Sequence, residues 1–370
     1  MKKLLLFLFI VGSLSAQTTV KTESGELNGA AFKIFVPEDW DGKLLMYAHG
    51  YEFMGSPRQS ENPQFEMRMK VFLDKGFAVA ASDYAYQGFA LAQGVDDTEA
   101  LRKYFIEKYG APTQTIMAGH SMGGGVTLAM LENFGQFYDG GLALCPLSSR
   151  PYLQCRKEFD IYATFNGLFP GVVTNLSDIF DLEKPYLAQD SRKMVAKAQE
   201  IKKAILAKDS ILGKAFASRF DLKFDDLPFS LFFNENVLRD LAQKAGGNPF
   251  DNTNTVYSGF PDNWEVNQKA ERLGATVDPN VIFSKYDRTG NIDKPAVILH
   301  TIYDQLIPPT FGVTNYENMV IEQGNTNFLT VKYTKGQGHC QFSDEETEAA
   351  FESLLNWLET GQKALAGPIE

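Results

Sequence analysis

One short segment, a serine held between glycines, restricts the fold of this chain more than any other feature. Residues 119–123 read Gly-His-Ser-Met-Gly. The apolar residues 114–118 before them predict a buried strand, and residues 126–131 after them predict a helix. In so tight a strand-to-helix turn the serine hydroxyl is exposed, and a Cβ at either flanking glycine would clash. The chain is therefore predicted to contain a sharp turn with Ser121 at its tip.

The pentapeptide alone is a weak signal, so its other interpretations matter. A glycine-rich turn can be free of chemistry, or it can bind phosphate. A phosphate-binding loop of the P-loop kind needs a lysine after its glycines, and here Val126 and Thr127 follow. The strand before and the helix after favour a nucleophile instead. The start of that helix directs amide N–H groups and a positive dipole end at any oxyanion formed beside Ser121.

The first sixteen residues are typical of an export signal. Two lysines precede an apolar stretch at residues 4–11, and small residues close the segment at 13–16. The apolar run is too short to span a bilayer. We therefore expect a signal peptide over residues 1–16, a mature chain from about Gln17, and export to the periplasm or the medium.

The net charge and the cysteines limit which binding partners, disulfides and metal sites this chain can have. The formal net charge is −11, which repels nucleic acid and anionic membranes and argues against both as partners. No stable membrane insertion is expected. Cys145, Cys155 and Cys340 permit at most one intrachain disulfide, and no Cys/His spacing suggests a structural metal site. We expect no metal and no cofactor, and the oligomeric state stays open.

Strand and helix patterns alternate along most of the chain. Near-continuous apolar strands separated by helices predict an α/β fold, with a mainly parallel sheet covered by helices on both faces, built from residues 17–146 and 294–370. Residues 147–293 are too many for a loop. Helical patterns at 194–206 and 231–245 predict that they form an inserted, mostly helical cap. Such an insertion either fills space or forms a lid over the ligand crevice, and we favour the lid.

The individual core elements follow from the same patterns. The first two strands are expected to pair over residues 20–36 and to turn near Ser24 and Gly25. The other expected strands are residues 43–48, 77–84, 114–118, 141–145, 296–300 and 327–333, and the expected helices are 65–75, 97–109 and 344–358.

A serine hydroxyl is a poor nucleophile until a base takes its proton. The chain has four histidines. His49 follows an early strand, His120 lies inside the turn itself, and His300 lies within a strand. His339 follows the last strand, in a glycine-rich loop that can reach over the sheet edge. Elimination leaves His339 as the base.

The base needs an acid that fixes its tautomer. Asp304 directly follows the strand before the one that leads to His339, so it is expected within reach. It could also be a turn or cap aspartate before a proline. Asp287 lies in a stretch that resembles cap or linker, and Asp83 follows a strand on the wrong side of the nucleophile. The order Ser121, Asp304, His339 is the α/β-hydrolase order.

An oxyanion hole needs two donors. The amide of Met122, directly after the nucleophile, is one candidate. The amide of Tyr51, in the loop after the third expected strand, is the other. The Tyr51 hydroxyl could donate or line the pocket instead, and His49-Gly50-Tyr51 could be only a turn that ends a strand.

These pieces resemble the α/β-hydrolase superfamily over nearly all of the mature chain outside the cap, and within it a group of exported bacterial hydrolases. The shared pieces are His49-Gly50-Tyr51, residues 119–124, Cys145, residues 247–252, residues 299–301 with Asp304, and residues 338–340. The resemblance implies hydrolase chemistry. Tannases and feruloyl esterases also place a cysteine after the histidine, but they bridge it to a cysteine before the serine. His120 stands there in this chain, so it departs from their pattern.

Chain geometry suggests a disulfide between Cys145 and Cys340. Cys145 ends the strand after the turn helix, which is expected beside the nucleophile strand. The loop carrying His339 must cross above that strand end to reach Ser121, which brings Cys340 over Cys145. Two free thiols, or a bridge between Cys145 and Cys155, stay open as alternatives.

Together these features predict a cofactor-free serine hydrolase that cleaves a carboxylic ester through an acyl-enzyme on Ser121. The expected substrate is a small-molecule or carbohydrate-linked ester. A serine peptidase of the aminopeptidase kind is an alternative, although no obvious acidic cluster for a substrate amine is visible. The other alternative is a non-catalytic binding protein on a hydrolase scaffold. The complete Ser/Asp/His set argues against it.

Overall fold

The structure is a computed structural model, and it describes residues 19–184 and 191–369. The expected signal peptide, residues 1–16, lies outside the described residues. No helix within the described ranges has the length and apolar character needed to cross a membrane.

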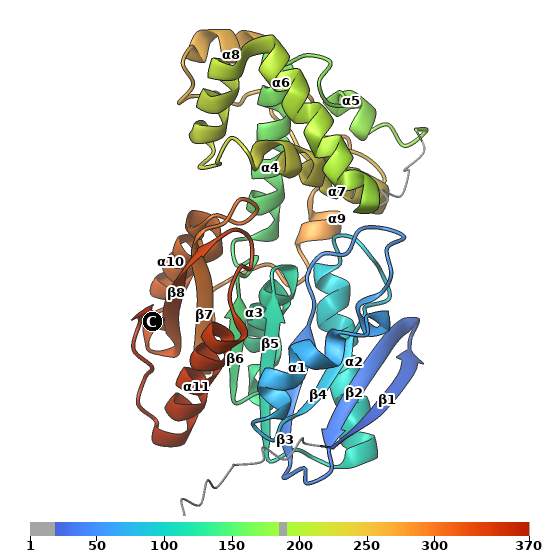
Figure 1. Ribbon diagram of the computed structural model, residues 1–370, viewed down its shortest axis with the longest axis vertical. Helices are drawn as coiled ribbons and strands as arrows, with labels where there is room; N and C mark the ends of the chain where they lie inside the picture. Colours follow the sequence, from blue (N-terminus) through green and yellow to red (C-terminus); the bar gives the residue numbers. More distant parts are fainter. Residues whose placement is uncertain (1–18, 185–190, 370) are drawn as a thin grey trace, which may run out of the picture.

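The described residues form a sheet of nine strands, which lies in the lower part of the molecule in Figure 1. The strands run in the spatial order β1-β2-β4-β3-β5-β6-β7-β8-β9. From β4 to β9 every neighbouring pair is parallel, whereas β2 is antiparallel to both β1 and β4. Their bounds are β1 Val20–Leu27, β2 Ala30–Pro37, β3 Lys43–Ala48, β4 Ala78–Ser82, β5 Gln114–His120, β6 Gly140–Leu144, β7 Ala296–Tyr303, β8 Leu329–Gln337 and β9 Gly367–Pro368.

The first hairpin turns later than the sequence suggested. Its turn is Asn28-Gly29, and both residues have positive φ, 53° and 83°. Asn-Gly is the preferred pair for a two-residue turn of this kind, because both positions need that conformation. Gly25 instead lies inside β1 opposite Phe32, where a Cβ would come within 2.6 Å of the phenyl ring. The expectation of a turn near Ser24 and Gly25 is therefore wrong.

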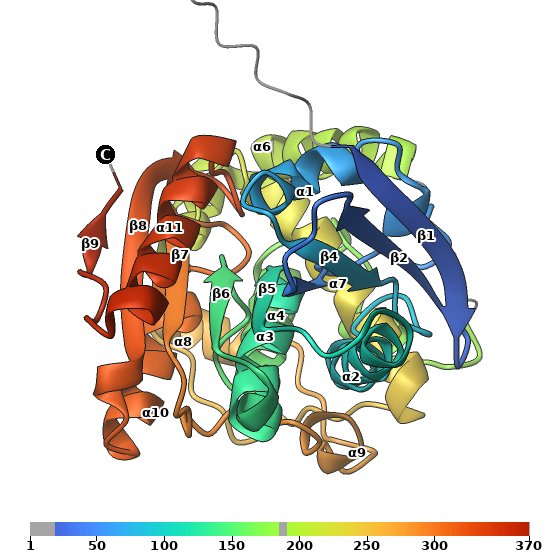
Figure 2. The ribbon, with the colours of Figure 1, turned by 90° about the horizontal axis from the view of Figure 1, so that it is seen from below.

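Helices cover both faces of the sheet, as Figure 2 shows from below. Alternation along β3 explains why: Leu44 and Met46 point into one apolar cluster, and Leu45 and Tyr47 into the other. The first cluster contains α2, α3 and α10, and the second contains α1 and α11. Their bounds are α1 Phe65–Leu73, α2 Leu91–Tyr109, α3 Met122–Phe134, α10 Asn315–Glu322 and α11 Asp344–Thr360.

A helical insertion follows β6 and lies over the carboxyl ends of the parallel strands (Figure 1). Its helices are α4 Pro151–Leu168, α5 Leu176–Ile179, α6 Ser191–Arg219, α7 Leu227–Ala245, α8 Asn263–Lys269 and α9 Asn280–Phe283. The long helix α6 is interrupted at Asp209, whose φ and ψ are −160° and 101°. Buried phenylalanines such as Phe159, Phe165 and Phe250 hold the insertion together. We refer to α4–α9 as the cap.

The strand order, the helices on both faces and the insertion after β6 are those of the α/β-hydrolase fold. The predicted fold class, a mainly parallel sheet with a helical insertion, is thus confirmed. Helix α2 begins at Leu91, six residues before the expected start at residue 97. Strand β9 and helix α4 were not expected at all. The first is only two residues long, and the second shows little contrast between its two faces because most of it is buried.

Candidate active site

Ser121 occupies a strained turn between β5 and α3. Its φ and ψ are 58° and −121°, a conformation that residues with a Cβ rarely adopt. The chain can approach itself this closely only where side chains are absent. A Cβ on Gly119 would lie 2.4 Å from the Gly123 carbonyl oxygen, and one on Gly123 would lie 2.1 Å from that of Ala48. Both glycines are therefore required by the turn that exposes Ser121.

Three residues from distant parts of the chain meet at this turn. His339 Nε2 lies 2.8 Å from Ser121 Oγ, and His339 Nδ1 lies 2.7 Å from Asp304 Oδ2. Nε2 can therefore accept the serine proton while Nδ1–H donates to the carboxylate. The structure brings together all three residues that the sequence singled out, and their catalytic role stays a prediction.

The Asp304 carboxylate is fixed at both of its oxygens. Oδ1 accepts hydrogen bonds from the amides of Leu306 and Ile307, at 2.9 and 2.8 Å. Oδ2 faces His339. Burial raises the pKa of Asp304, but the nearby imidazole and the amide hydrogen bond outweigh burial, and the pKa lies below its usual value. Asp304 thus stays ionised and can stabilise an imidazolium at His339.

The loop that carries His339 is hydrogen-bonded to the end of β7 and to the residues that directly follow it. The Gly338 amide donates to the Tyr303 carbonyl at 2.9 Å, and the His339 amide donates to Gln305 Oε1 at 2.9 Å. The Thr301 hydroxyl donates to the Gly338 carbonyl at 3.1 Å. The same short segment therefore positions both the acid, Asp304, and the imidazole that it orients.

A disulfide joins Cys145 to Cys340, as the sequence suggested. The Cα atoms are 5.3 Å apart, and Cys145 directly follows β6, the neighbour of β5. Cys155 is buried and free. Among the residues that the structure describes, one group of metal-ligating atoms lies close together, and it consists of these two bonded cysteines with His339. Their sulfurs are bonded to each other and the imidazole faces Ser121 and Asp304, so this group is not arranged as a metal centre.

The loop after β3 comes close to the nucleophile. A Cβ on Gly50 would lie 3.2 Å from Ser121 Cβ. The loop is held in place because the Tyr84 hydroxyl donates to the His49 carbonyl at 3.0 Å and the Gly88 amide donates to the Glu52 carbonyl at 2.8 Å. This places residue 51 beside the reacting atoms.

The two expected oxyanion donors lie on either side of Ser121. Met122 is the first residue of α3, and amides in the first turn of a helix have no acceptor within that helix. Tyr51 lines the same cavity as Ser121, and its ring packs edge-on against Phe233 of the cap. The oxyanion role of Met122 and Tyr51 stays a prediction.

The rival histidines lie in other surroundings. His120 is on the far side of the turn, where its Nδ1 lies 3.0 Å from the Tyr47 hydroxyl, and burial lowers its pKa to about 4. His300 is buried within β7, and burial lowers its pKa as well. His49 is buried and stacks on the ring of Tyr84. Each of these rings contacts groups other than Ser121.

The rival aspartates are also engaged elsewhere. Asp83 accepts hydrogen bonds from the amide and the hydroxyl of Ser60. Asp287 lies 3.9 Å from the Arg150 guanidinium, and its carboxylate accepts the Arg288 amide.

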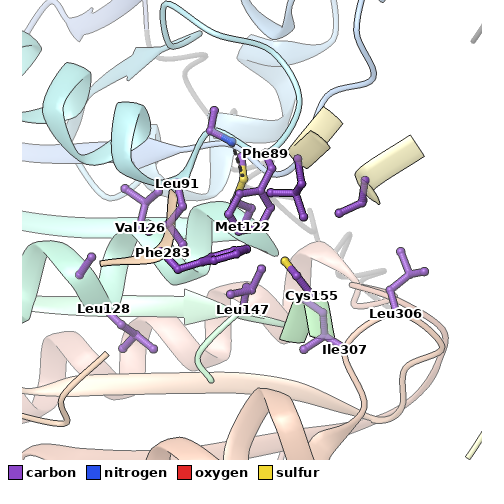
Figure 3. Packing of buried hydrophobic residues seen from close by; sticks show 14 of the residues in the cluster. Phe89, Leu91, Met122, Val126, Leu128, Leu147, Cys155, Phe283, Leu306 and Ile307 are labelled. Atoms are coloured by element: carbon purple, nitrogen blue, oxygen red, sulfur yellow. Dashed lines mark hydrogen bonds between the residues drawn. The ribbon is translucent and has the colours of Figure 1, made fainter. Parts of the chain in front are cut away.

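A small cavity of about 30 Å³ lies beside the nucleophile. Its walls combine core and cap, and they include Ser121, His339, Met122, Leu147, Phe233 and Val237. Figure 3 shows Met122 packed near Phe89 and Leu147, with Leu306 and Ile307 beyond them. The Met122 sulfur accepts a hydrogen bond from the Ala90 amide at 3.3 Å. The reacting groups thus face a largely apolar space.

Two polar residues of this cavity were missed by the sequence analysis. Gln154 and Glu158 of helix α4 line it, and their exposed fractions are 1% and 5%. Their spacing of four residues puts both on one helix face. That spacing of four residues is a weak sequence signal, because the charged residues Arg156, Lys157 and Asp160 lie in the same stretch.

A larger cavity of about 480 Å³ opens between the cap and the segment after β7. Leu153 and Lys157 of α4 line it together with Pro308 and Phe311, whereas Ser121, Asp304 and His339 do not. We therefore place the site at the smaller cavity, where the reactive groups are.

The turn at Ser121, the strand order and the Ser–His–Asp contacts are those of the α/β-hydrolase fold. No family model matches the chain. A curated relative, an o-phthalyl amidase from Xanthobacter agilis, is 23% identical over 417 residues, covering 92% of this chain and 88% of the relative.

Several solved structures are similar to this chain at low sequence identity. An esterase from Pyrococcus furiosus is 15% identical with a TM-score of 0.46, covering 92% of this chain and 91% of its own. Est1E from Butyrivibrio proteoclasticus, a structure with bound ferulic acid, is 16% identical with a TM-score of 0.47, covering 91% and 100%. An acylaminoacyl peptidase from Pyrococcus horikoshii is 10% identical with a TM-score of 0.48, covering 96% and 43%.

Proposed function

We propose that this protein is an exported serine hydrolase that cleaves carboxylic esters through an acyl-enzyme on Ser121. The observation that carries the proposal is the continuous contact from Ser121 Oγ through His339 to Asp304, at 2.8 and 2.7 Å. A nucleophile, a base and an orienting acid in hydrogen-bond reach of one another are what acyl transfer requires.

The first half of the reaction forms the acyl-enzyme. Ser121 Oγ attacks the acyl carbon while His339 Nε2 takes the hydroxyl proton. Asp304 holds Nδ1–H and stabilises the imidazolium. The amides of Met122 and Tyr51 donate to the oxyanion. When the tetrahedral intermediate collapses, Nε2–H gives its proton to the leaving alcohol.

The second half of the reaction releases the acid. Water takes the position of the alcohol, His339 Nε2 removes its proton, and the hydroxide oxygen attacks the acyl carbon. The second intermediate collapses and returns the proton to Ser121 Oγ. No redox step occurs in this sequence, and every proton passes through one imidazole.

An amide is the second candidate for the scissile bond. It is favoured by the similarity to the o-phthalyl amidase, which extends over 92% of this chain. The same groups would serve, with His339 Nε2–H protonating the leaving nitrogen instead of an oxygen. We favour the ester because an alkoxide leaves more readily than an amine anion. Ester cleavage therefore depends less on proton donation from His339 to the leaving group.

The cap would act as a lid on this site. The cavity beside Ser121 is far smaller than the roughly 300–1,000 Å³ of a typical ligand pocket. Substrate binding therefore needs the side chains of α4 and α7, among them Phe233 and Val237, to move outward. In this arrangement the core residues catalyse the reaction, and the cap residues determine which substrates bind.

The proposal is tested with a fluorophosphonate and two substrate panels. The reagent should add one phosphonyl group to the peptide that contains Ser121, and Ser121→Ala should abolish labelling. Purified protein should hydrolyse p-nitrophenyl esters faster than acyl p-nitroanilides. Undiminished labelling of Ser121→Ala would refute the nucleophile. Faster anilide cleavage would select the amidase. Fractionation of cells that produce the full chain would test export.

A further inference from the structure

Helix α4 places two polar side chains in the cavity that holds the nucleophile. Gln154 and Glu158 are one helical turn apart, almost fully buried, and line the cavity together with Ser121 and His339. They come from the cap, whereas the triad comes from the core. The proposed ester cleavage assigns them no role.

Some of the polar atoms of Gln154 and Glu158 make hydrogen bonds, and others do not. Gln154 Nε2 donates to Glu158 Oε1 at 3.1 Å and to the Leu306 carbonyl at 3.1 Å. Both amide protons are thus used, which fixes the orientation of the amide group. Gln154 Oε1 and Glu158 Oε2 are left without a hydrogen-bond partner among the described residues.

Two buried acceptors without donors are costly in a folded protein. Burying such a group unsatisfied costs about 1–3 kcal/mol, so buried polar atoms nearly always have partners. The neighbouring Lys157 ammonium donates to the Leu306 carbonyl, at 2.9 Å, and it makes no hydrogen bond to either of the two acceptors. A group that supplies hydrogen-bond donors from the cavity would complete the pair.

We propose that Gln154 Oε1 and Glu158 Oε2 form an acceptor pair that binds a hydrogen-bond donor of the substrate, a hydroxyl or an ammonium group. This inference rests on the proposed function, because it concerns the substrate of the same site. A methyl group in that position leaves both acceptors unsatisfied. A carboxylate has no proton to donate and meets the charge of Glu158.

The pair also explains how an otherwise apolar cavity can select its substrate. Apolar walls discriminate weakly between similar groups, whereas a site built to bind a donor rejects an analogue that lacks one. The ammonium form would bring the chain closer to an aminopeptidase, for which the sequence offered no acidic cluster. Glu158 is the carboxylate that was missing from that interpretation.

The test uses matched esters that differ only at one end. Four p-nitrophenyl 3-arylpropanoates carry a para hydroxyl, aminomethyl, methyl or carboxyl group, and four benzyl acetates carry the same substituents on the alcohol. We expect kcat/KM for the hydroxyl or the aminomethyl ester to exceed that for the methyl ester about tenfold or more in one series. The carboxyl ester should be the poorest of the four.

Variants of Glu158 then test whether the preference for a hydrogen-bond donor comes from the Gln154–Glu158 pair. Glu158→Met should bring the donor-to-methyl ratio to within about twofold of one, and Leu153→Ala, on an exposed face of α4, should leave it unchanged. Glu158→Gln keeps an acceptor but removes the charge. It should retain a preference for hydroxyl and lose one for ammonium, which identifies the donor. The rate of fluorophosphonate labelling, measured in every variant, shows that Ser121 is still correctly placed.

The outcomes separate the two proposals. Normal labelling and ester cleavage without any donor preference, or with a preference that survives Glu158→Met, would overturn this inference and leave the proposed function standing. Absence of both labelling and ester cleavage in the parent protein would remove the proposed function, and the substrate inference with it.

Discussion

The disulfide partner of Cys340 is Cys145, so the residue directly after His339 is bonded to the strand end beside the nucleophile. Cys340 has a φ of 54°, and its backbone needs a support that holds this conformation. The bond supplies it, because Cys145 follows β6 and β6 pairs with β5, which ends at His120 next to Ser121. The disulfide therefore ties His339, the proposed base, to the sheet that carries Ser121.

Removing this disulfide should lower both stability and catalytic rate. The bond spans 195 residues, and chain-entropy arguments give a stabilisation of about 5 kcal/mol for a loop of that size. We expect the Cys145→Ala/Cys340→Ala variant to unfold at a lower urea concentration and to label more slowly with a fluorophosphonate. Cys155→Ala, which removes the free thiol, should label at the parent rate. Equal labelling rates in all three proteins would contradict a positioning role for the bond.

The acid of the triad should be identifiable by an isosteric change. Asp304→Asn keeps the shape of the side chain, but it removes the charge that stabilises the imidazolium and favours the wrong tautomer of His339. We expect kcat to fall by about three to four orders of magnitude with little change in KM. Asp287→Asn is the matched control and should stay within about twofold of the parent, since Asp287 contacts arginines rather than His339. A similar loss in both variants would disprove the assignment.

The grouping of Ser121, Asp304 and His339 could be predicted from the sequence because each of these residues carries a local signal. Ser121 lies between glycines at a strand end, Asp304 directly follows β7, and His339 is in a glycine-rich loop after β8. The topology of a parallel sheet brings such positions to one edge. The disulfide followed from the same reasoning, because the path of the His339 loop had to pass over Cys145.

Other features depend on packing that the sequence does not display. The first hairpin was misplaced because Gly25 resembles a turn residue, although it is in fact the small residue that makes room for Phe32. Gln154 and Glu158 line the cavity beside Ser121 because α4 packs against that cavity. The position of a cap helix over the core is set by many weak contacts rather than by a motif. Polar residues in such a helix are indistinguishable from surface residues until the fold is known.

A contact between cap and core should be important for the shape of the substrate cavity. Asp240 of α7 accepts a hydrogen bond from the buried Phe89 amide, and Phe89 lines the cavity. Asp240→Ala leaves that amide without its acceptor, and we expect the free energy of unfolding to fall by about 2–3 kcal/mol. The ranking of ester substrates should change while Ser121 remains reactive to a fluorophosphonate.

The matched control for this contact is Asp225→Ala. Asp225 is in the cap too, but it forms an exposed ion pair with Lys202, at 2.7 Å. Exposed ion pairs contribute little to stability, so this variant should unfold at the same urea concentration as the parent and keep the parent's substrate ranking. If both variants lost the same stability, a specific role for Asp240 would be refuted.

The buried carboxyl of Glu158 should leave a signature in the pH dependence of stability. Burial raises its pKa from 4.5 to about 6, and the Lys157 charge and the Gln154 amide only partly oppose this. A folded-state pKa above the unfolded value means that the folded protein binds the proton more tightly. The stabilisation from Glu158 is therefore full below about pH 4.5 and is lost as the pH rises through 6.

The side chain in Glu158→Gln cannot ionise, so this variant should not lose this stability as the pH rises. A shift from 4.5 to about 6 corresponds to about 2 kcal/mol between pH 4 and pH 8. Relative to the parent, the variant should become more stable by that amount across this range, as measured by urea unfolding at both pH values. Any cost of the new amide that does not depend on pH cancels in this difference. The stability of Leu153→Ala relative to the parent should not change between the two pH values. A variant-to-parent difference that does not change with pH would mean that Glu158 has an ordinary pKa, and that ionising it inside the cavity costs the fold nothing.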